Sequence, residues 1–94
     1  MNHSEEEIFT IYVLWLTGFS QALIARYMRM RVKQVAGIVT HSEYTNRAAM
    51  TDAERQTYLD ELREVHRQDP VPSPILDRVS WKVLPLSGRQ LRRA

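Results

Sequence analysis

The chain of 94 residues contains no cysteine and only three glycines. The lack of cysteine excludes disulfides, cysteine-based zinc sites and thiol catalysis, and it favours a cytosolic protein over a secreted one. The glycines are isolated from one another, so no glycine-rich loop can cradle a phosphate. No apolar run approaches the ~18 residues that a bilayer-spanning helix needs. The sequence therefore predicts a cytoplasmic protein with no membrane partner.

Residues for metal and catalytic centres are also scarce. His3, His41 and His66 lie far apart in the sequence and lack the spacing of metal ligands. No glycine-rich elbow surrounds any serine. The acidic run of residues 5–7 suits the positive end of a helix dipole better than it suits acid catalysis. We therefore expect no enzyme, no metal and no cofactor.

The net charge of +2 is distributed in alternating blocks. Residues 1–24 carry −3, residues 25–49 carry +4, residues 50–69 carry −3 and residues 70–94 carry +4. The basic blocks are suited to a polyanion, and the acidic blocks should face away from it or contact a protein.

Two capping boxes mark the starts of the outer helices. Residues 4–7 read Ser-Glu-Glu-Glu and residues 51–54 read Thr-Asp-Ala-Glu, which predicts helices over 5–17 and 52–68. The first helix is apolar on more than one side, so its own fold or another subunit must cover it. The second carries a narrow apolar stripe. We expect partner or dimer contacts from that stripe and from a tryptophan in the C-terminal segment: Tyr58, Leu62, Val65 and Trp81.

Two short helices joined by a tight turn are expected between them, over 21–28 and 31–40. Counted from Gln21, positions 5, 8, 10, 15 and 18 of a helix-turn-helix have the expected small or apolar character: Ala25, Met28, Met30, Val35 and Ile38. The ninth position is Arg29, where glycine usually permits a left-handed turn. A one-residue shift, or a homeodomain-like turn, would relieve that conflict. The N-cap of the second helix is poor, since no short side-chain oxygen precedes it.

The stretch from Leu14 to Ala25, LWLTGFSQALIA, resembles the start of the GcrA-like cell-cycle regulators of alphaproteobacteria, roughly L-W-x-x-G-x-S-x-x-x-I-A. Residues 33–39, KQVAGIV, are similar to that family's recognition segment, N-A-V-I-G-K-V. Members bind DNA through this domain and engage the housekeeping sigma factor. The resemblance implies a DNA-binding regulator. It leaves RNA polymerase or sigma factor open as a further partner, because the sigma contact itself is not carried over. The family's Gly-Gly turn is absent near Arg29, and nothing beyond Ser42 has a counterpart.

We expect the helix over 31–40 to read the major groove of double-stranded DNA. Arg31 and Lys33 could reach guanine edges or phosphates, and Gln34 could pair with adenine. Gly37 costs about 1 kcal/mol of helix stability relative to alanine, which predicts a close approach by the first helix or by DNA. The full candidate set for DNA binding, including residues that could hold the backbone, is Arg29, Arg31, Lys33, Gln34, Ala36, Gly37, Thr40 and Arg47.

The sequence as a whole predicts an all-α protein in three parts. A helix-turn-helix domain occupies 1–42, a loop and a charged amphipathic helix occupy 43–69, and a Pro-linked tail occupies 70–94. We expect a bacterial or phage transcriptional regulator, associated with the nucleoid, in which a homodimer would set two recognition helices about 34 Å apart. The alternative is a protein-interaction module that keeps a helix-turn-helix-like fold and binds RNA polymerase or another regulator. The acidic helix and the tail support that alternative.

Overall fold

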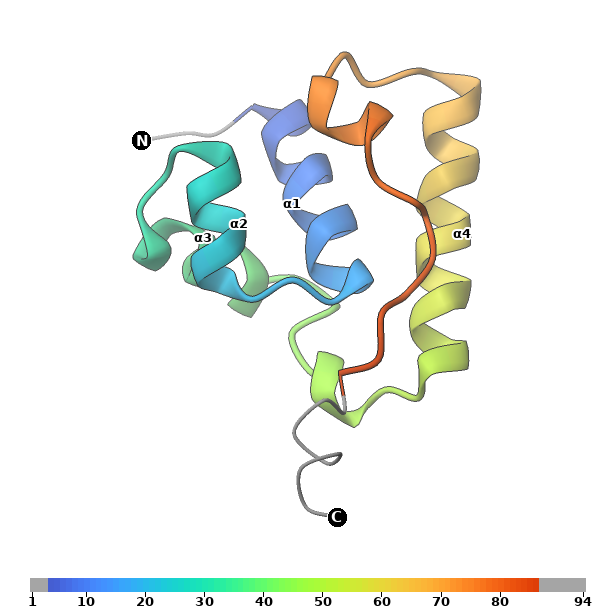
Figure 1. The fold of residues 1–94 in the computed structure, drawn as a ribbon, viewed down its shortest axis with the longest axis horizontal. Helices are drawn as coiled ribbons and strands as arrows, with labels where there is room; N and C mark the ends of the chain where they lie inside the picture. Colours follow the sequence, from blue (N-terminus) through green and yellow to red (C-terminus); the bar gives the residue numbers. More distant parts are fainter. Residues whose placement is uncertain (1–3, 87–94) are drawn as a thin grey trace.

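The computed structural model describes residues 4–86 and is all-α, with no strand in that range (Figure 1). Residues 1–3 and 87–94, with His3 and the last part of the predicted tail, lie outside it. The helices are α1 (Glu5–Thr17), α2 (Gln21–Met28), α3 (Val32–Thr40) and α4 (Asp52–Gln68), with short 3₁₀ helices η1 (Arg47–Ala49) and η2 (Pro74–Asp77). Three helices match the predicted bounds, and α3 begins one residue later than expected.

Helix α1 lies at the centre of the fold, with α2 and α3 on one side and α4 on the other (Figure 1). Its start follows the predicted capping box, because the Glu7 amide donates to Ser4 Oγ at 3.0 Å and the Ser4 amide donates to Glu7 Oε1 at 3.1 Å. Nearly all of its second half is buried: Thr10, Ile11, Val13, Leu14, Trp15, Leu16 and Thr17. The apolar surface of α1 is therefore covered by the chain's own fold.

Gly18 ends α1 with a positive φ of 127°. The Phe19 amide donates to the Leu14 carbonyl at 3.1 Å, and the Gly18 amide donates to the Trp15 carbonyl at 3.1 Å. This pair of bonds is a Schellman motif, which suits glycine because a side chain is strained at that φ. The backbone carbonyl of Leu84 lies 3.2 Å from where a Cβ of residue 18 would be, so the site also lacks space.

Two arginines distant in sequence reach the carboxyl end of α1. Arg47 Nη1 donates to the carbonyls of Trp15 and Phe19, both at 2.8 Å, and its guanidinium lies 3.5 Å from the centre of the Trp15 ring. Arg55 Nη1 donates to the Leu16 carbonyl at 2.8 Å. A helix end carries partial negative charge and unpaired carbonyls, and α1 has no basic residue in its last turn. The two guanidinium groups therefore supply the positive charge and the hydrogen-bond donors that the last turn of α1 lacks.

The segment after α4 packs against α1 and α4 rather than extending away (Figure 1). Leu76 and Trp81 belong to the same buried cluster as the residues of α1 and α3. The Gln56 side chain holds this segment on α4, because its Nε2 donates to the Trp81 carbonyl at 2.9 Å and its Oε1 accepts from the Val83 amide at 3.0 Å. The three predicted parts of the chain thus share one core.

Candidate nucleic-acid interface

The turn between α2 and α3 keeps the register that was predicted from Gln21. Arg29 adopts the left-handed conformation, with φ 57° and ψ 46°. The Met30 amide donates to the Ala25 carbonyl at 2.9 Å, and the Arg29 amide donates to the Arg26 carbonyl at 3.4 Å. Neither a shifted turn nor another turn type relieves the conflict at Arg29. Arg29 instead adopts the left-handed backbone conformation itself, which costs roughly 1 kcal/mol for a residue other than glycine.

The two faces of α3 differ in burial and in residue type. Val35 and Val39 are buried, and Ile38 packs against the same core. The opposite side forms what we call the outward stripe of α3, which is exposed or half-buried and consists of Val32, Lys33, Ala36, Gly37 and Thr40. Its members recur at spacings of three to four residues, so they line one side of the helix. The apolar back and open front match those required of a helix that enters a groove.

The start of α3 is poorly capped, as predicted. Arg31 is the N-cap residue and has no side-chain oxygen that could accept from the first amides. Gln34 partly compensates, because its Oε1 accepts from the Arg31 amide at 3.0 Å. The Gln34 side chain is thus bonded to the start of its own helix. Gln34 is also half-buried and does not belong to the outward stripe. Reading an adenine with both amide atoms would require this bond to break.

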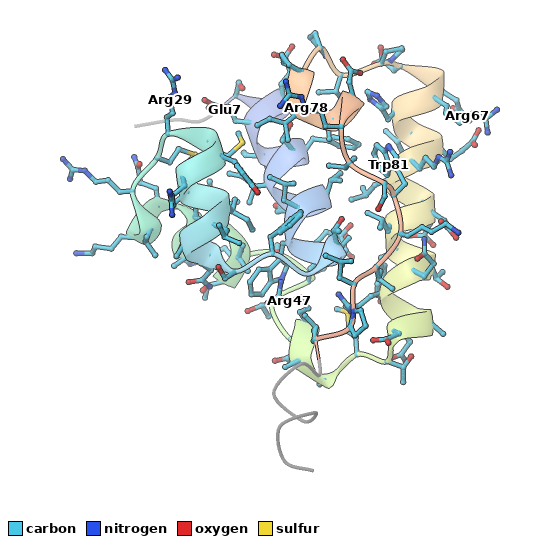
Figure 2. All side chains as sticks on the ribbon, in the orientation of Figure 1. Glu7, Arg29, Arg47, Arg67, Arg78 and Trp81 are labelled. Carbon is cyan, nitrogen blue, oxygen red and sulfur yellow. The ribbon has the colours of Figure 1, made fainter. Side chains whose placement is uncertain are left out.

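Four exposed cations surround the turn and the start of α3: Arg26, Arg29, Arg31 and Lys33. None of them forms an ion pair with another residue of the range 4–86. The sequence has no Asp or Glu between Glu7 and Glu43 to neutralise them. Arg29 points away from the body of the protein (Figure 2), and the acidic helix α4 lies on the far side of α1 (Figure 1). Arg26 joins this set, although the sequence prediction omitted it from the DNA-binding residues.

Gly37 has open space where a side chain would be, since no atom of residues 4–86 outside its own helix backbone and chain neighbours lies within 4 Å of an ideal Cβ. Of the two causes predicted for a glycine here, a close approach by α1 is wrong. A glycine on an exposed helix face lowers helix stability by about 1 kcal/mol relative to alanine, and nothing inside the described fold requires it. Ala36 next to it is also small, so the middle of the outward stripe leaves the α3 backbone accessible.

The two remaining candidates lie at the end of α3 and beyond it, in η1. Thr40 is exposed on the last turn of α3. Arg47 is half-buried on the Trp15 ring and bonded to two carbonyls of α1, so its guanidinium serves the fold. Tyr44 also closes the domain, since its carbonyl accepts from Trp15 Nε1 at 2.8 Å. Nothing in the local sequence around Arg47 indicated these contacts, which join residues about thirty positions apart.

The predicted partner contacts lie mostly within the fold. Tyr58 packs edge-on against Tyr44 with ring centres 5.4 Å apart, and Leu62 packs against the core. The Trp81 ring stacks on His66 at 5.7 Å and faces α4 (Figure 2). Of the four residues, Val65 alone remains largely exposed, at 52%. The outer face of α4 is therefore charged, with one large apolar side chain, Val65, exposed on it.

A comparison with protein-family models, curated proteins and solved structures finds no match to this chain. Within residues 4–86, no helix is both long and apolar enough to cross a membrane. The same range contains no group of three or more His, Asp or Glu side chains that could hold a metal ion. The assignment of a function to this interface therefore depends on its geometry and its charge alone.

Proposed function

We propose that the chain is a sequence-specific DNA-binding transcriptional regulator that places α3 in the major groove. The observation that supports this proposal is the outward stripe of α3. It presents small residues at its centre and Lys33 near its amino-terminal end, next to the exposed N-cap residue Arg31, while the opposite face of the helix is fixed in the core. The resemblance of residues 14–25 and 33–39 to GcrA-like regulators agrees with a bacterial or phage origin for this role.

Each part of the interface has a distinct task in this proposal. Lys33 and Arg31 reach base edges or phosphates from the first turn of α3. Ala36 and Gly37 allow the helix backbone to approach the base edges closely. Arg29 and Thr40, at opposite ends of the motif, contact the phosphate backbone and set the register. Binding should weaken steeply with salt, because every neutralised phosphate releases counterions.

The test is affinity for a duplex selected from a random pool, measured by fluorescence anisotropy at several salt concentrations. The double variant Arg31→Ala/Lys33→Ala should lose at least about tenfold in affinity, since a good base contact is worth about 1–3 kcal/mol. Arg63→Ala/Arg67→Ala removes the same charge from the exposed face of α4 and is the matched control. Parent-like binding by the first variant, or equal losses in both, would contradict the assignment of α3.

A second candidate function is binding of another protein, such as RNA polymerase, through α4. The exposed Val65 on a charged helix favours it. Truncation at Asp69 is unsuited to the test, because it would remove Leu76 and Trp81 from the core. Val65→Glu leaves the core intact. A chain that binds purified RNA polymerase but no duplex at low salt, and loses the polymerase on Val65→Glu, would favour this second candidate.

A further inference from the structure

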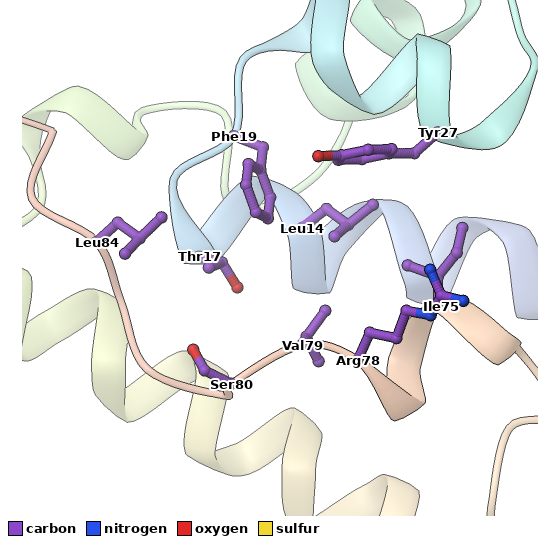
Figure 3. Close-up of a pocket in the computed structure, with 9 residues that line it drawn as sticks. All are labelled: Leu14, Thr17, Phe19, Tyr27, Ile75, Arg78, Val79, Ser80 and Leu84. Carbon is purple, nitrogen blue, oxygen red and sulfur yellow. The ribbon is translucent and has the colours of Figure 1, made fainter.

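A cavity of about 490 Å³ lies on the side of the molecule where α1, α2 and the segment 75–84 meet (Figure 3). Its volume falls within the range of about 300–1,000 Å³ that is typical of small-molecule sites. The walls are mainly apolar. Leu14 and Phe19 come from α1 and the loop after it, and Ile75, Val79 and Leu84 come from the last segment. Such a lining favours a ligand with an apolar body.

One end of the cavity is positively charged. Among the described residues that line it, Arg78 carries the single charged side chain. Arg78 lies beside Ile75, whereas Leu84 lies at the opposite end (Figure 3). Arg78 is exposed and forms no ion pair with another residue of the described part of the chain. Its neighbour Asp77 does not line the cavity. The charge of Arg78 is therefore available to a ligand.

Neutral polar groups complete the lining. Tyr27 extends over the cavity from α2, with its hydroxyl towards Phe19 (Figure 3). The Ser80 hydroxyl accepts from the Lys82 amide at 3.3 Å, which leaves its own hydrogen free to donate. An apolar surface with a cation at one end and hydroxyl groups at the rim is complementary to an amphiphile with an acidic head.

We propose that this cavity binds a small apolar carboxylate, such as a medium-chain fatty acid. The carboxylate pairs with Arg78, and the apolar body lies along Leu14, Phe19 and Val79 towards Leu84. The chain's own residues 87–94 are a poor occupant, because they carry three arginines and no acidic side chain, so that Arg78 would repel their positive charge. The proposal goes beyond DNA binding and does not depend on it, since the site shares no residue with the outward stripe of α3.

The experiment titrates the full chain, without DNA, with octanoate, octanol and octylamine, and follows backbone amides by NMR. Octanoate should shift the amides around the cavity and leave those of Lys33 and Ala36 unchanged. It should bind about tenfold more tightly than octanol, because a charge-assisted hydrogen bond is stronger than a neutral one, and octylamine should bind most weakly. Failure of DNA binding would not change any of these results.

Three variants make the test specific to the site. Arg78→Gln should reduce octanoate affinity about tenfold and leave octanol affinity unchanged. Lys82→Gln, on the same segment but outside the lining, is the matched control and should bind octanoate as the parent does. Ser80→Phe, at an exposed position, should fill the cavity and abolish binding of both. Equal affinity for the three probes, shifts located on α4, or no effect of Arg78→Gln would overturn the proposal.

Discussion

The Arg55 guanidinium donates to the Leu16 carbonyl at 2.8 Å from a position with no solvent exposure. Its Nη2 also donates to the Leu84 carbonyl, and the Leu84 amide in turn donates to the Thr17 carbonyl at 2.7 Å. The one carboxylate paired with Arg55 among the described residues is that of Asp52, at 3.3 Å, and this carboxylate is itself largely exposed. The buried charge is thus balanced mainly by two backbone carbonyls, that of Leu16 at the end of α1 and that of Leu84 in the segment after α4.

Replacing Arg55 with alanine should destabilise the protein strongly. The buried Leu16 carbonyl and the partly buried Leu84 carbonyl would lose a charged donor, each such bond being worth about 1.5–3 kcal/mol. We expect the free energy of unfolding, measured by urea denaturation, to fall by about 3 kcal/mol. Arg63→Ala, at an exposed position on the same helix, should change it by less than about 0.5 kcal/mol. Similar small effects of both variants would show that the buried guanidinium is not needed.

Arg29→Gly should separate backbone strain from charge. Glycine adopts the left-handed conformation of residue 29 without a Cβ penalty, so the free energy of unfolding should rise by roughly 1 kcal/mol. Arg29→Ala removes the same charge but keeps the penalty, so its stability should stay near that of the parent. If Arg29 contacts phosphate, both variants should lower DNA affinity and reduce the salt slope by about 1. A similar stability gain in both variants would show that the gain comes from loss of the Arg29 side chain and not from relief of backbone strain.

Gly37→Ala should change stability and binding in opposite directions. The added methyl group meets no atom of the described fold, and alanine favours the helix by up to about 1 kcal/mol, so the thermal midpoint should rise. If DNA approaches the α3 backbone at Gly37, the same methyl group should weaken duplex binding. Unchanged duplex affinity in Gly37→Ala would remove the close-approach argument.

Burial, reinforced by the nearby Glu43, raises the pKa of Tyr44 from 10.0 to about 12. A group whose pKa is higher in the folded than in the unfolded state makes a stability contribution that is fully present below the unfolded pKa. That contribution is lost as the pH rises towards the folded pKa. The free energy of unfolding should therefore fall between pH 10 and about 12, by up to about 3 kcal/mol for a shift of this size. Urea denaturation across that range should give a smaller decrease for Tyr44→Phe. Equal decreases would assign the effect to other groups.

Local chemistry accounts for the parts of the fold that the sequence predicted well. The caps at Ser4, Ser20 and Thr51 each accept from an amide three residues further on, so the helix starts were readable from short motifs. Gly18 likewise marked the end of α1. Such signals depend on neighbours in the sequence, which is why three helices had the predicted bounds.

Long-range contacts account for what the sequence did not reveal. Arg55 lies on a charged helix and has the pattern of an exposed residue, yet it is fully buried, because its carbonyl partners are 29 and 39 positions away. Trp81 has a positive φ of 61°, a conformation that is rare for a large side chain. Its place in the core depends on the contacts of Gln56 and His66. At the candidate interface, the outward stripe was predicted in part, whereas Arg47 was assigned to DNA although its guanidinium is bonded to α1.

The pairing of Thr17 with Leu84 also constrains the order in which the chain can acquire its structure during synthesis. The first helix leaves the ribosome early, but its last carbonyl, that of Thr17, finds its partner only after residue 84 has emerged. Until then, part of the broad apolar surface of α1 is exposed in the nascent chain, where chaperones or proteases can bind it. A stalled or prematurely terminated product should therefore be degraded rather than accumulate as a shortened competitor.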